Sequence, residues 1–341
     1  MSTVLAALTV LATLAGCSRE PAAERFGGPT MGTSYSVVVT RMPAGLDRAR
    51  VQALIDDVLR EVDDHLSTYD PASEISGFNA RPGTDWRPVS PLLYSVVERA
   101  RQVYRESGGA FDITVGPLVQ LWGFGADARA IEAMPDPHLI EHARGVTGLD
   151  KLEARAEGPA LRKTSSGLRL DVDGIAPGLA VDLIVERLRS AGIEDCLVEI
   201  GGEVRARGRS PAGRIWRIAV EVPLTGERRP YTLVELDDLA VSTSGDYRDF
   251  RLVGGHRVSH TVDPRTGAPV THDLASVSVL HPSTALADAY ATALMVLGPE
   301  EGMAMARRLG LAALFIERSG TEDGFRERVT PEFTRLRRPV T

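Results

Sequence analysis

Residues 259–292 bring a histidine, a proline-containing turn, a carboxylate and a hydroxyl into one short span. His260 comes first, just before the turn Asp-Pro-Arg-Thr-Gly at 263–267. An imidazole titrates near neutral pH, so His260 could act as a general base. Asp288 and Thr292 are four residues apart, which places both oxygen atoms on one face of a helix. A carboxylate with a hydroxyl suits Mg²⁺, a hard cation that takes few protein ligands.

Each of these features also has a purely structural explanation. An aspartate early in a helix interacts favourably with the helix dipole, and a threonine can bond back to its own helix. A single histidine in a strand is more often an ordinary hydrogen-bonding residue, and the turn at 263–267 requires no chemistry. The span alone therefore leaves catalysis and scaffolding both open.

The helix that carries Asp288 is predicted to begin after Ser283, a typical N-cap residue. It is predicted to end at the Gly-Pro pair 298–299, because glycine and proline both interrupt helices. A last helix over 299–309 and a strand over 311–317 follow. These elements close the predicted domain.

Two regions upstream are expected to supply the rest of a site. Residues 195–281 contain short strand patterns separated by Gly, Pro and Asp turns, which predict hairpins in an antiparallel or mixed sheet. Residues 168–192 predict a strand to about Val172, a tight turn at 173–174 and a helix to Gly192. Glycines at such a junction let the backbone approach a phosphate, although they are also common scaffolding. The segment is neither a Walker A loop nor a Rossmann fingerprint.

The N-terminal half is predicted to be mainly helical. Apolar residues over 46–66 follow the spacing of an amphipathic helix, which ends before a turn that presents Tyr69. A second helix begins with Ser90 as N-cap and Pro91 at its first position. The glycine-flanked loop at 110–125 carries an aspartate and aromatic residues, and 136–146 predicts a surface helix.

The composition indicates a globular protein with no nucleic-acid partner. The chain has 341 residues, of which 43% are hydrophobic, so it can bury a large core. Its formal net charge is −7, and no concentrated basic surface for binding phosphate backbones is visible. We expect a single catalytic domain of the α+β class over 26–341.

The N-terminus has the pattern of an exported lipoprotein. Residues 1–16 carry no charged side chain and form an apolar run that suits a signal peptide but is short for a membrane span. Leu-Ala-Gly-Cys at 14–17 resembles a bacterial lipobox, which predicts lipid on Cys17, a tether over 17–25 and a location on the membrane of the cell envelope, facing the periplasm in a Gram-negative cell. A plain secretory signal or a buried N-terminal segment is the alternative.

Taken together, several segments resemble the ApbE family of FAD:protein FMN transferases over nearly all of 26–316. They read MGTSYSV, STYDP, GGAFDITVGPLVQLWGFG, LDVDGIAPGLAVD, VEIGGEVRARG, VSTSGDY, SHTVDPRTGAPV and ALADAYATALMVLG. The resemblance implies an ApbE-like domain with a mixed β-sheet and flanking helices. It also implies an exported protein, often a lipoprotein, which agrees with the N-terminal pattern.

The resemblance further implies roles for individual residues. Gly174 matches a backbone-carbonyl ligand of Mg²⁺, and Asp288 and Thr292 match its side-chain ligands. His260 matches the histidine before the DPRTG turn, the candidate base. The positions that match FAD contacts, or lie near the flavin, are Met31, Tyr69, Ala110, Phe111, Asp112, Asp171 and Val262. Pro177 departs from the family, which usually has an FAD-contacting lysine there, and this proline removes both a cation and a backbone donor.

The implied reaction is the Mg²⁺-dependent transfer of FMN from FAD to a Thr or Ser hydroxyl of an exported acceptor protein of a redox system. Mg²⁺ neutralises the pyrophosphate, His260 accepts the hydroxyl proton, the oxygen attacks the FMN-side phosphorus and AMP leaves. Asp288 serves the reaction as a metal ligand. If water replaces the hydroxyl, the site is an FAD pyrophosphatase that yields FMN and AMP. A non-catalytic FAD-binding lipoprotein is a further alternative, because Pro177 replaces the lysine.

Overall fold

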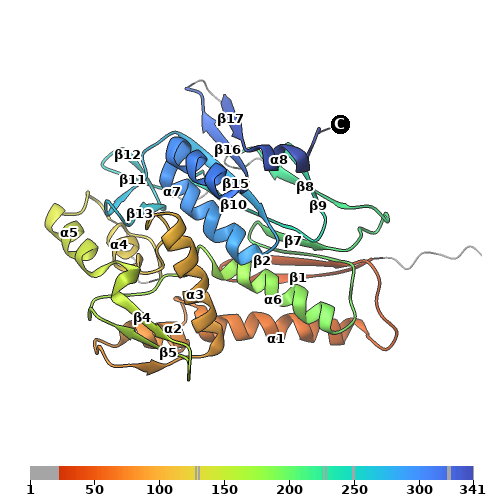
Figure 1. Cartoon of the computed structure of the whole chain (residues 1–341), viewed down its shortest axis with the longest axis horizontal. Coiled ribbons are helices and arrows are strands. Elements are labelled where there is room, and N and C mark those ends of the chain that lie inside the picture. The colour runs from red at the N-terminus through yellow and green to blue at the C-terminus, as the bar shows by residue number, and fades with distance from the viewer. Residues whose placement is uncertain are drawn as a thin grey trace, which may run out of the picture.

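A wide antiparallel sheet forms the centre of the computed structural model (Figure 1). The structure describes residues 23–126, 129, 131–224, 226, 229–247, 250–320 and 324–340. Within these ranges eight strands follow the order β1-β2-β6-β7-β10-β15-β16-β17, and each neighbouring pair is antiparallel. The strands are β1 (Glu24–Thr30), β2 (Thr33–Val39), β6 (Cys196–Ile200), β7 (Glu203–Arg207), β10 (Ala240–Gly245), β15 (Leu274–His281), β16 (Ala312–Arg318) and β17 (Phe325–Val329). The predicted α+β class is confirmed.

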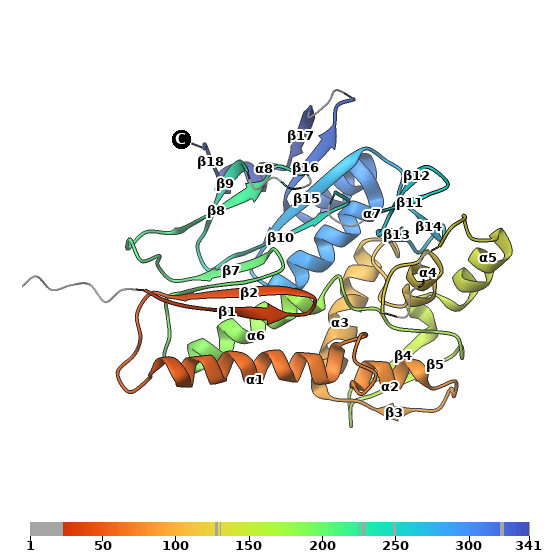
Figure 2. The same ribbon diagram turned by 180° about the vertical axis from the view of Figure 1, so that it is seen from behind.

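Long helices cover one face of this sheet. They are α1 (Arg48–Leu66), α3 (Pro91–Glu106), α6 (Ala176–Ser190) and α7 (Thr284–Leu309). α6 and α7 lie against the strands, and α1 and α3 pack against these two helices (Figures 1 and 2). The largest apolar core fills the space between them and includes Ile184, Val277 and Leu294, all fully buried.

The predicted helix starts are confirmed by their caps. The side chain of Ser90 accepts a hydrogen bond from the N–H of Leu93, and Ser283 accepts one from the N–H of Leu286. The predicted break at 298–299 is a kink inside α7, where Gly298 has φ 73° and ψ −174°. A glycine suits this kink because its φ lies in the left-handed region. The next strand, β16, runs as expected over nearly the predicted residues.

The other face of the sheet is buried by a smaller layer. This layer consists of β8 (Trp216–Glu221), β9 (Pro230–Leu236), α8 (Pro331–Leu336) and β18 (Arg337–Arg338). Trp216, Leu236 and Phe333 pack there against sheet residues such as Val204 and Leu314. Since both faces are covered, the sheet is a rigid platform for what is attached to it.

A group of short elements lies at one end of the sheet, beside α3 (Figure 2). The elements are α2 (Glu74–Ala80), β3 (Arg87–Pro88), α4 (Gly116–Leu121), α5 (Pro137–Val146), a 3₁₀ turn (Leu149–Lys151), β4 (Leu152–Arg155), β5 (Ala160–Lys163), β11 (Phe250–Val253), β12 (His256–Ser259), β13 (Val262–Asp263) and β14 (Ala268–Pro269). A small apolar core that includes Trp122, Phe124 and Val258 joins α4 to the β11–β12 hairpin. The Trp122 indole N–H donates to the Gly267 carbonyl at 2.8 Å. The loop that contains Trp122 and the turn that contains Gly267, far apart in the sequence, are thereby held together.

The prediction of a strand that ends near Val172 is wrong. Within the described residues this segment forms only an isolated parallel bridge between Arg169 and Val115. The side chain of Asn79 takes the place of a partner strand, accepting from the Leu170 N–H at 2.7 Å and donating to the Leu170 carbonyl at 2.8 Å. Buried backbone groups must be paired, and here a side-chain amide pairs them.

The N-terminal predictions, including the one for Cys17, lie mostly outside the described residues. β1 begins at Glu24, inside the predicted 17–25 tether and two residues before the predicted start of the domain. Among the helices of the described ranges, none is long and apolar enough to cross a membrane.

Candidate active site

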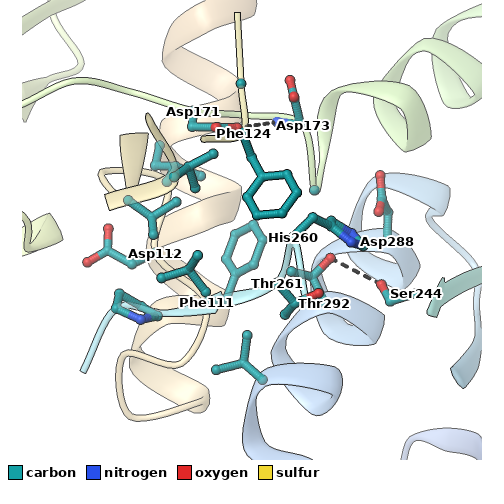
Figure 3. A pocket seen from close by; sticks show the side chains of 18 of the residues that line it. Phe111, Asp112, Phe124, Asp171, Asp173, Ser244, His260, Thr261, Asp288 and Thr292 are labelled. Carbon is teal, nitrogen blue, oxygen red and sulfur yellow. Dashed lines mark hydrogen bonds between the residues drawn. The ribbon is translucent and has the colours of Figure 1, made fainter. Parts of the chain in front are cut away.

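A cavity of about 360 Å³ opens where the start of α7 meets the loop at 110–125 and the turn at 171–174 (Figure 3). Segment 260–264 closes a further side. The side chains and backbone that line it belong to Tyr69, Ala110, Phe111, Asp112, Ile113, Val115, Val119, Phe124, Gly125, Asp171, Asp173, Gly174, Glu203, Thr243, Ser244, Gly245, His260, Thr261, Val262, Pro264, Asp288, Thr292 and Val296. No lysine or arginine is among these lining residues.

Helix α7 presents Asp288 and Thr292 on the face that the spacing predicts. Asp288 is 6% exposed, and its carboxylate accepts a hydrogen bond from the Gly178 N–H at 3.2 Å. The Thr292 hydroxyl lies 3.3 Å from the hydroxyl of Ser244 on β10 (Figure 3). Both oxygens are therefore fixed at the cavity wall by neighbouring elements.

The turn at 171–174 approaches the same helix. The Asp171 carboxylate accepts the N–H of Asp173 at 3.0 Å, which tightens the turn. A Cβ on Gly174 would lie 3.0 Å from the Thr292 hydroxyl oxygen and 3.3 Å from the Phe111 ring. Glycine is thus favoured here by the close approach of the turn to Thr292.

Carboxyl groups cluster in the cavity. Burial raises the pKa of Asp288 well above its ordinary value, the charges of Glu203 and Asp173 add to this effect, and the Gly178 N–H opposes it. The charge of Asp171 raises the pKa of Asp173 to about 8, with burial as the second cause and a hydrogen bond from Tyr69 opposing it. Burial also raises the pKa of Asp171 itself. Asp173 lies at the open side of the cavity, so solvent screens part of the Asp171 effect.

His260 lies on the segment between β12 and β13. Its ring packs edge to face near Phe124, with ring centroids 6.4 Å apart and planes at 68°. Figure 3 shows the imidazole pointing toward Asp288 on the far wall of the cavity. The position fits a base that faces the wall carrying Asp288.

The turn at 263–267 has a structural role in the described contacts. Asp263 accepts the Gly267 N–H through its carbonyl at 2.8 Å and the Arg265 N–H through its carboxylate at 2.8 Å. The Arg265 guanidinium also bonds to the Asp263 carboxylate and to Glu301 of α7. The turn is thereby braced internally and linked by an exposed ion pair to the part of α7 beyond the Gly298 kink.

The residues proposed from the sequence mostly converge on this cavity. Those that line it are Tyr69, Ala110, Phe111, Asp112, Asp171, Gly174, His260, Val262, Asp288 and Thr292. Met31 and Pro177 do not line it. Met31 sits in the turn between β1 and β2 with φ 46°, and Pro177 lies in the first turn of α6, one residue before the Gly178 N–H that reaches Asp288.

Asp112 has most of its carboxylate engaged within the protein. One oxygen accepts from the Thr114 N–H at 2.8 Å and from the Thr114 hydroxyl at 2.6 Å, and the other accepts from the Leu149 N–H at 3.1 Å. Burial is the main cause of its raised pKa. These bonds make Asp112 a brace of the 110–125 loop as well as a lining residue.

Other lining residues were not proposed from the sequence. The sequence could have indicated Asp173, because this residue stands in the predicted turn between Asp171 and Gly174. Phe124 belonged to the glycine-flanked loop but had no assigned role. Glu203 and Ser244 stand in the family-like segments VEIGGEVRARG and VSTSGDY but had no assigned role, and strands far apart in the sequence bring them to the cavity.

The donor set fits a hard divalent cation. Among the described residues no group of three or more His, Cys, Asp or Glu side chains is arranged to hold a metal ion. Mg²⁺ does not require such a group, because it binds through one or two carboxylates together with hydroxyls, carbonyls, water and substrate phosphates. A buried Asp288 beside Thr292, among further carboxyl groups and with no lysine or arginine in the lining, offers oxygen ligands for such a cation.

Comparison with known proteins gives a consistent result. The model of the ApbE family matches residues 31–315. An FAD:protein FMN transferase of Vibrio cholerae is 41% identical over 329 residues, which cover 96% of this chain and 97% of that protein. One of Salmonella typhimurium is 37% identical, covering 92% and 89% respectively. The solved structure of Pseudomonas stutzeri flavinyl transferase ApbE, in its apo form, is similar with a TM-score of 0.84 at 42% identity, covering 92% of this chain and 96% of that one.

Proposed function

Because the chain belongs to the ApbE family and is a flavin transferase, we propose that it moves FMN from FAD to a Ser or Thr hydroxyl of an acceptor protein in a Mg²⁺-dependent reaction. The observation that carries the proposal is the shared cavity of His260, Asp288 and Thr292. A candidate base, two hard-cation ligands and a glycine turn face one space. Phosphoryl transfer needs these parts and little covalent chemistry from the protein.

Asp288, Thr292 and the backbone carbonyl of Gly174 would hold the cation. When bound, Mg²⁺ would offset the charge of the FAD pyrophosphate and stabilise the charge that develops on the leaving phosphate. The protein's own part is to keep these oxygens in place. The Gly178 N–H and the Ser244 hydroxyl do so through their bonds to Asp288 and Thr292.

The flavin end of FAD would lie along the apolar part of the cavity. Phe111, Phe124, Val119 and Val262 supply this surface, which suits a planar aromatic ring system. Tyr69 stands at the opening and is 63% exposed, so its ring remains available for contact with a ligand.

His260 would take the proton from the acceptor hydroxyl. The freed oxygen pair then forms a bond to the FMN-side phosphorus, while the bond from that phosphorus to the bridging oxygen breaks. That oxygen leaves with AMP and carries its electron pair. The acceptor keeps FMN through a phosphoester bond.

We further propose that the enzyme works as a lipoprotein of the cell envelope. The support is the sequence pattern of 1–17, with its uncharged apolar run followed by Leu-Ala-Gly-Cys. Radiolabelled palmitate incorporation into the wild type, and its absence in Cys17→Ser, would test this.

The transfer is tested by incubating the protein with FAD, Mg²⁺ and a candidate exported redox protein. We expect flavin fluorescence on the denatured acceptor and one AMP released per label, both lost when the modified Thr or Ser is replaced by Ala. Free FMN and AMP without label would indicate a pyrophosphatase, and bound FAD without AMP would indicate a binding protein. Pro177→Lys in parallel should lower KM for FAD, because a cation near the phosphates favours the bound anion.

A further inference from the structure

Helices α6 and α7 begin side by side and cap each other. The Gly178 N–H at the start of α6 donates to the Asp288 carboxylate, one turn into α7, at 3.2 Å. In return, the N–H groups of Thr284 and Ala285 at the start of α7 donate to the Asp182 carboxylate, nearly two turns into α6, at 2.9 and 3.2 Å. Each helix therefore satisfies part of the other helix's unpaired N-terminal donors.

The two helix starts are in backbone contact. A Cβ added at Gly178 would lie 2.6 Å from the Thr284 carbonyl oxygen and 3.0 Å from the Ala285 Cα. Only a residue without a side chain fits between them without movement. The reciprocal bonds are therefore held by direct packing of one helix terminus on the other.

Strand β7 places a cation beside Asp182 but a carboxyl group beside Asp288. Arg205 pairs with Asp182 at 2.7 Å, and Glu203, two residues earlier on the same face of the strand, lies in the cavity beside Asp288. Asp182 also accepts from the hydroxyls of Ser283 and Thr284, each at 2.7 Å. Asp182 is thus neutralised and satisfied within the protein, whereas Asp288 lies beside further carboxyl groups in a cavity that no lysine or arginine lines.

We propose that Asp182 is a positioning residue for the cation site, which it serves by fixing the start of α7. Asp288 lies only four residues beyond the anchored Thr284, a rise of about 6 Å along the helix, so a shift of the anchor reaches Asp288 almost undiminished. This inference rests on the proposed function, because it concerns the Mg²⁺ site of that reaction.

The test compares Asp182→Asn with Glu317→Gln. Glu317 is a matched control, because it is also buried and paired with arginines, Arg326 and Arg328, but lies on β16 away from the start of α7. Mn²⁺ binding by electron paramagnetic resonance, thermal unfolding, and kcat and KM for FAD are measured for each. We expect Mn²⁺ affinity to fall roughly 10- to 100-fold in Asp182→Asn, as for other residues that orient metal ligands, and to stay within about twofold in Glu317→Gln.

A merely structural role would lower the unfolding temperature of both variants and leave Mn²⁺ affinity unchanged. Wild-type affinity in folded Asp182→Asn overturns the inference and leaves the proposed function intact. Absence of Mn²⁺ binding by the wild type overturns the cation site itself. If Asp182→Asn does not fold, Ser283→Ala and Arg205→Gln each remove one Asp182 partner, and unchanged Mn²⁺ affinity in both overturns the inference.

Discussion

Replacing Gly178 with alanine adds one methyl group at the contact between α6 and α7. The new Cβ would lie 2.6 Å from the Thr284 carbonyl oxygen, about 0.8 Å short of the 3.4 Å at which ordinary contact begins. The obstacle is backbone, so no side-chain rotation relieves it. The helices must separate, and a comparable separation would break the 3.2 Å bond from the residue 178 N–H to Asp288.

Two effects of Gly178→Ala compete. Alanine favours a helix over glycine by about 1 kcal/mol, whereas overpacking typically costs about 1–3 kcal/mol. The lost bond to a buried carboxylate adds about 1.5–3 kcal/mol. We expect the clash and the lost bond to exceed the gain, leaving net destabilisation of roughly 2–4 kcal/mol, together with weaker Mn²⁺ binding.

The assay is denaturant unfolding of metal-free protein, followed by Mn²⁺ titration of the folded variant. Gly145→Ala is the matched control, because Gly145 lies in helix α5 and a Cβ added there would have nothing within 4 Å. That change should be neutral or stabilising by up to about 1 kcal/mol. Equal or greater stability of Gly178→Ala, with wild-type Mn²⁺ affinity, would refute the contact argument.

Three further changes probe separate parts of the protein. His260→Ala should lower kcat by about 10²- to 10⁴-fold with little change in FAD affinity, and a full transfer rate would remove His260 as the base. Thr292→Val keeps the shape but not the hydroxyl, so the Mg²⁺ concentration for half-maximal rate should rise; an unchanged Mg²⁺ dependence contradicts its role as a ligand. For Lys163, burial and then the nearby Arg169 charge lower the pKa from 10.5 to about 8, so the unfolded chain holds this proton over a range where the folded chain has lost it. The stability of the wild type relative to Lys163→Met should therefore rise from pH 8 to 10.5 in denaturant titrations, and a flat difference would exclude the shift.

Helix boundaries were predictable because their signals are local. Ser90 and Ser283 each cap a donor three residues ahead, so their effect depends only on neighbouring residues. The placement of Asp288 and Thr292 on one face follows from helix geometry in the same way. The kink at Gly298 was also visible, since glycine followed by proline interrupts a helix wherever it stands.

The parts that sequence reasoning missed depend on distant contacts. The 168–172 segment alternates like a strand, yet the backbone of Leu170 is paired by the side chain of Asn79, 91 residues away. Glu203 enters the cavity only because β7 runs beside the start of α7. No local pattern of residue types shows which distant segments come into contact, so neither feature could be derived before the fold was known.

The pairing of β2 with β6 has a consequence for how the chain folds. Tyr35 lies opposite Ile200 and Val39 opposite Cys196, so about half of the chain separates the two strands. Contacts of such long range form late, because the loop-closure entropy must be overcome before they stabilise anything. Until β6 pairs with β2, the β2 edge of the β1–β2 hairpin is open and can pair with other chains. Truncations that end before residue 196 should therefore aggregate.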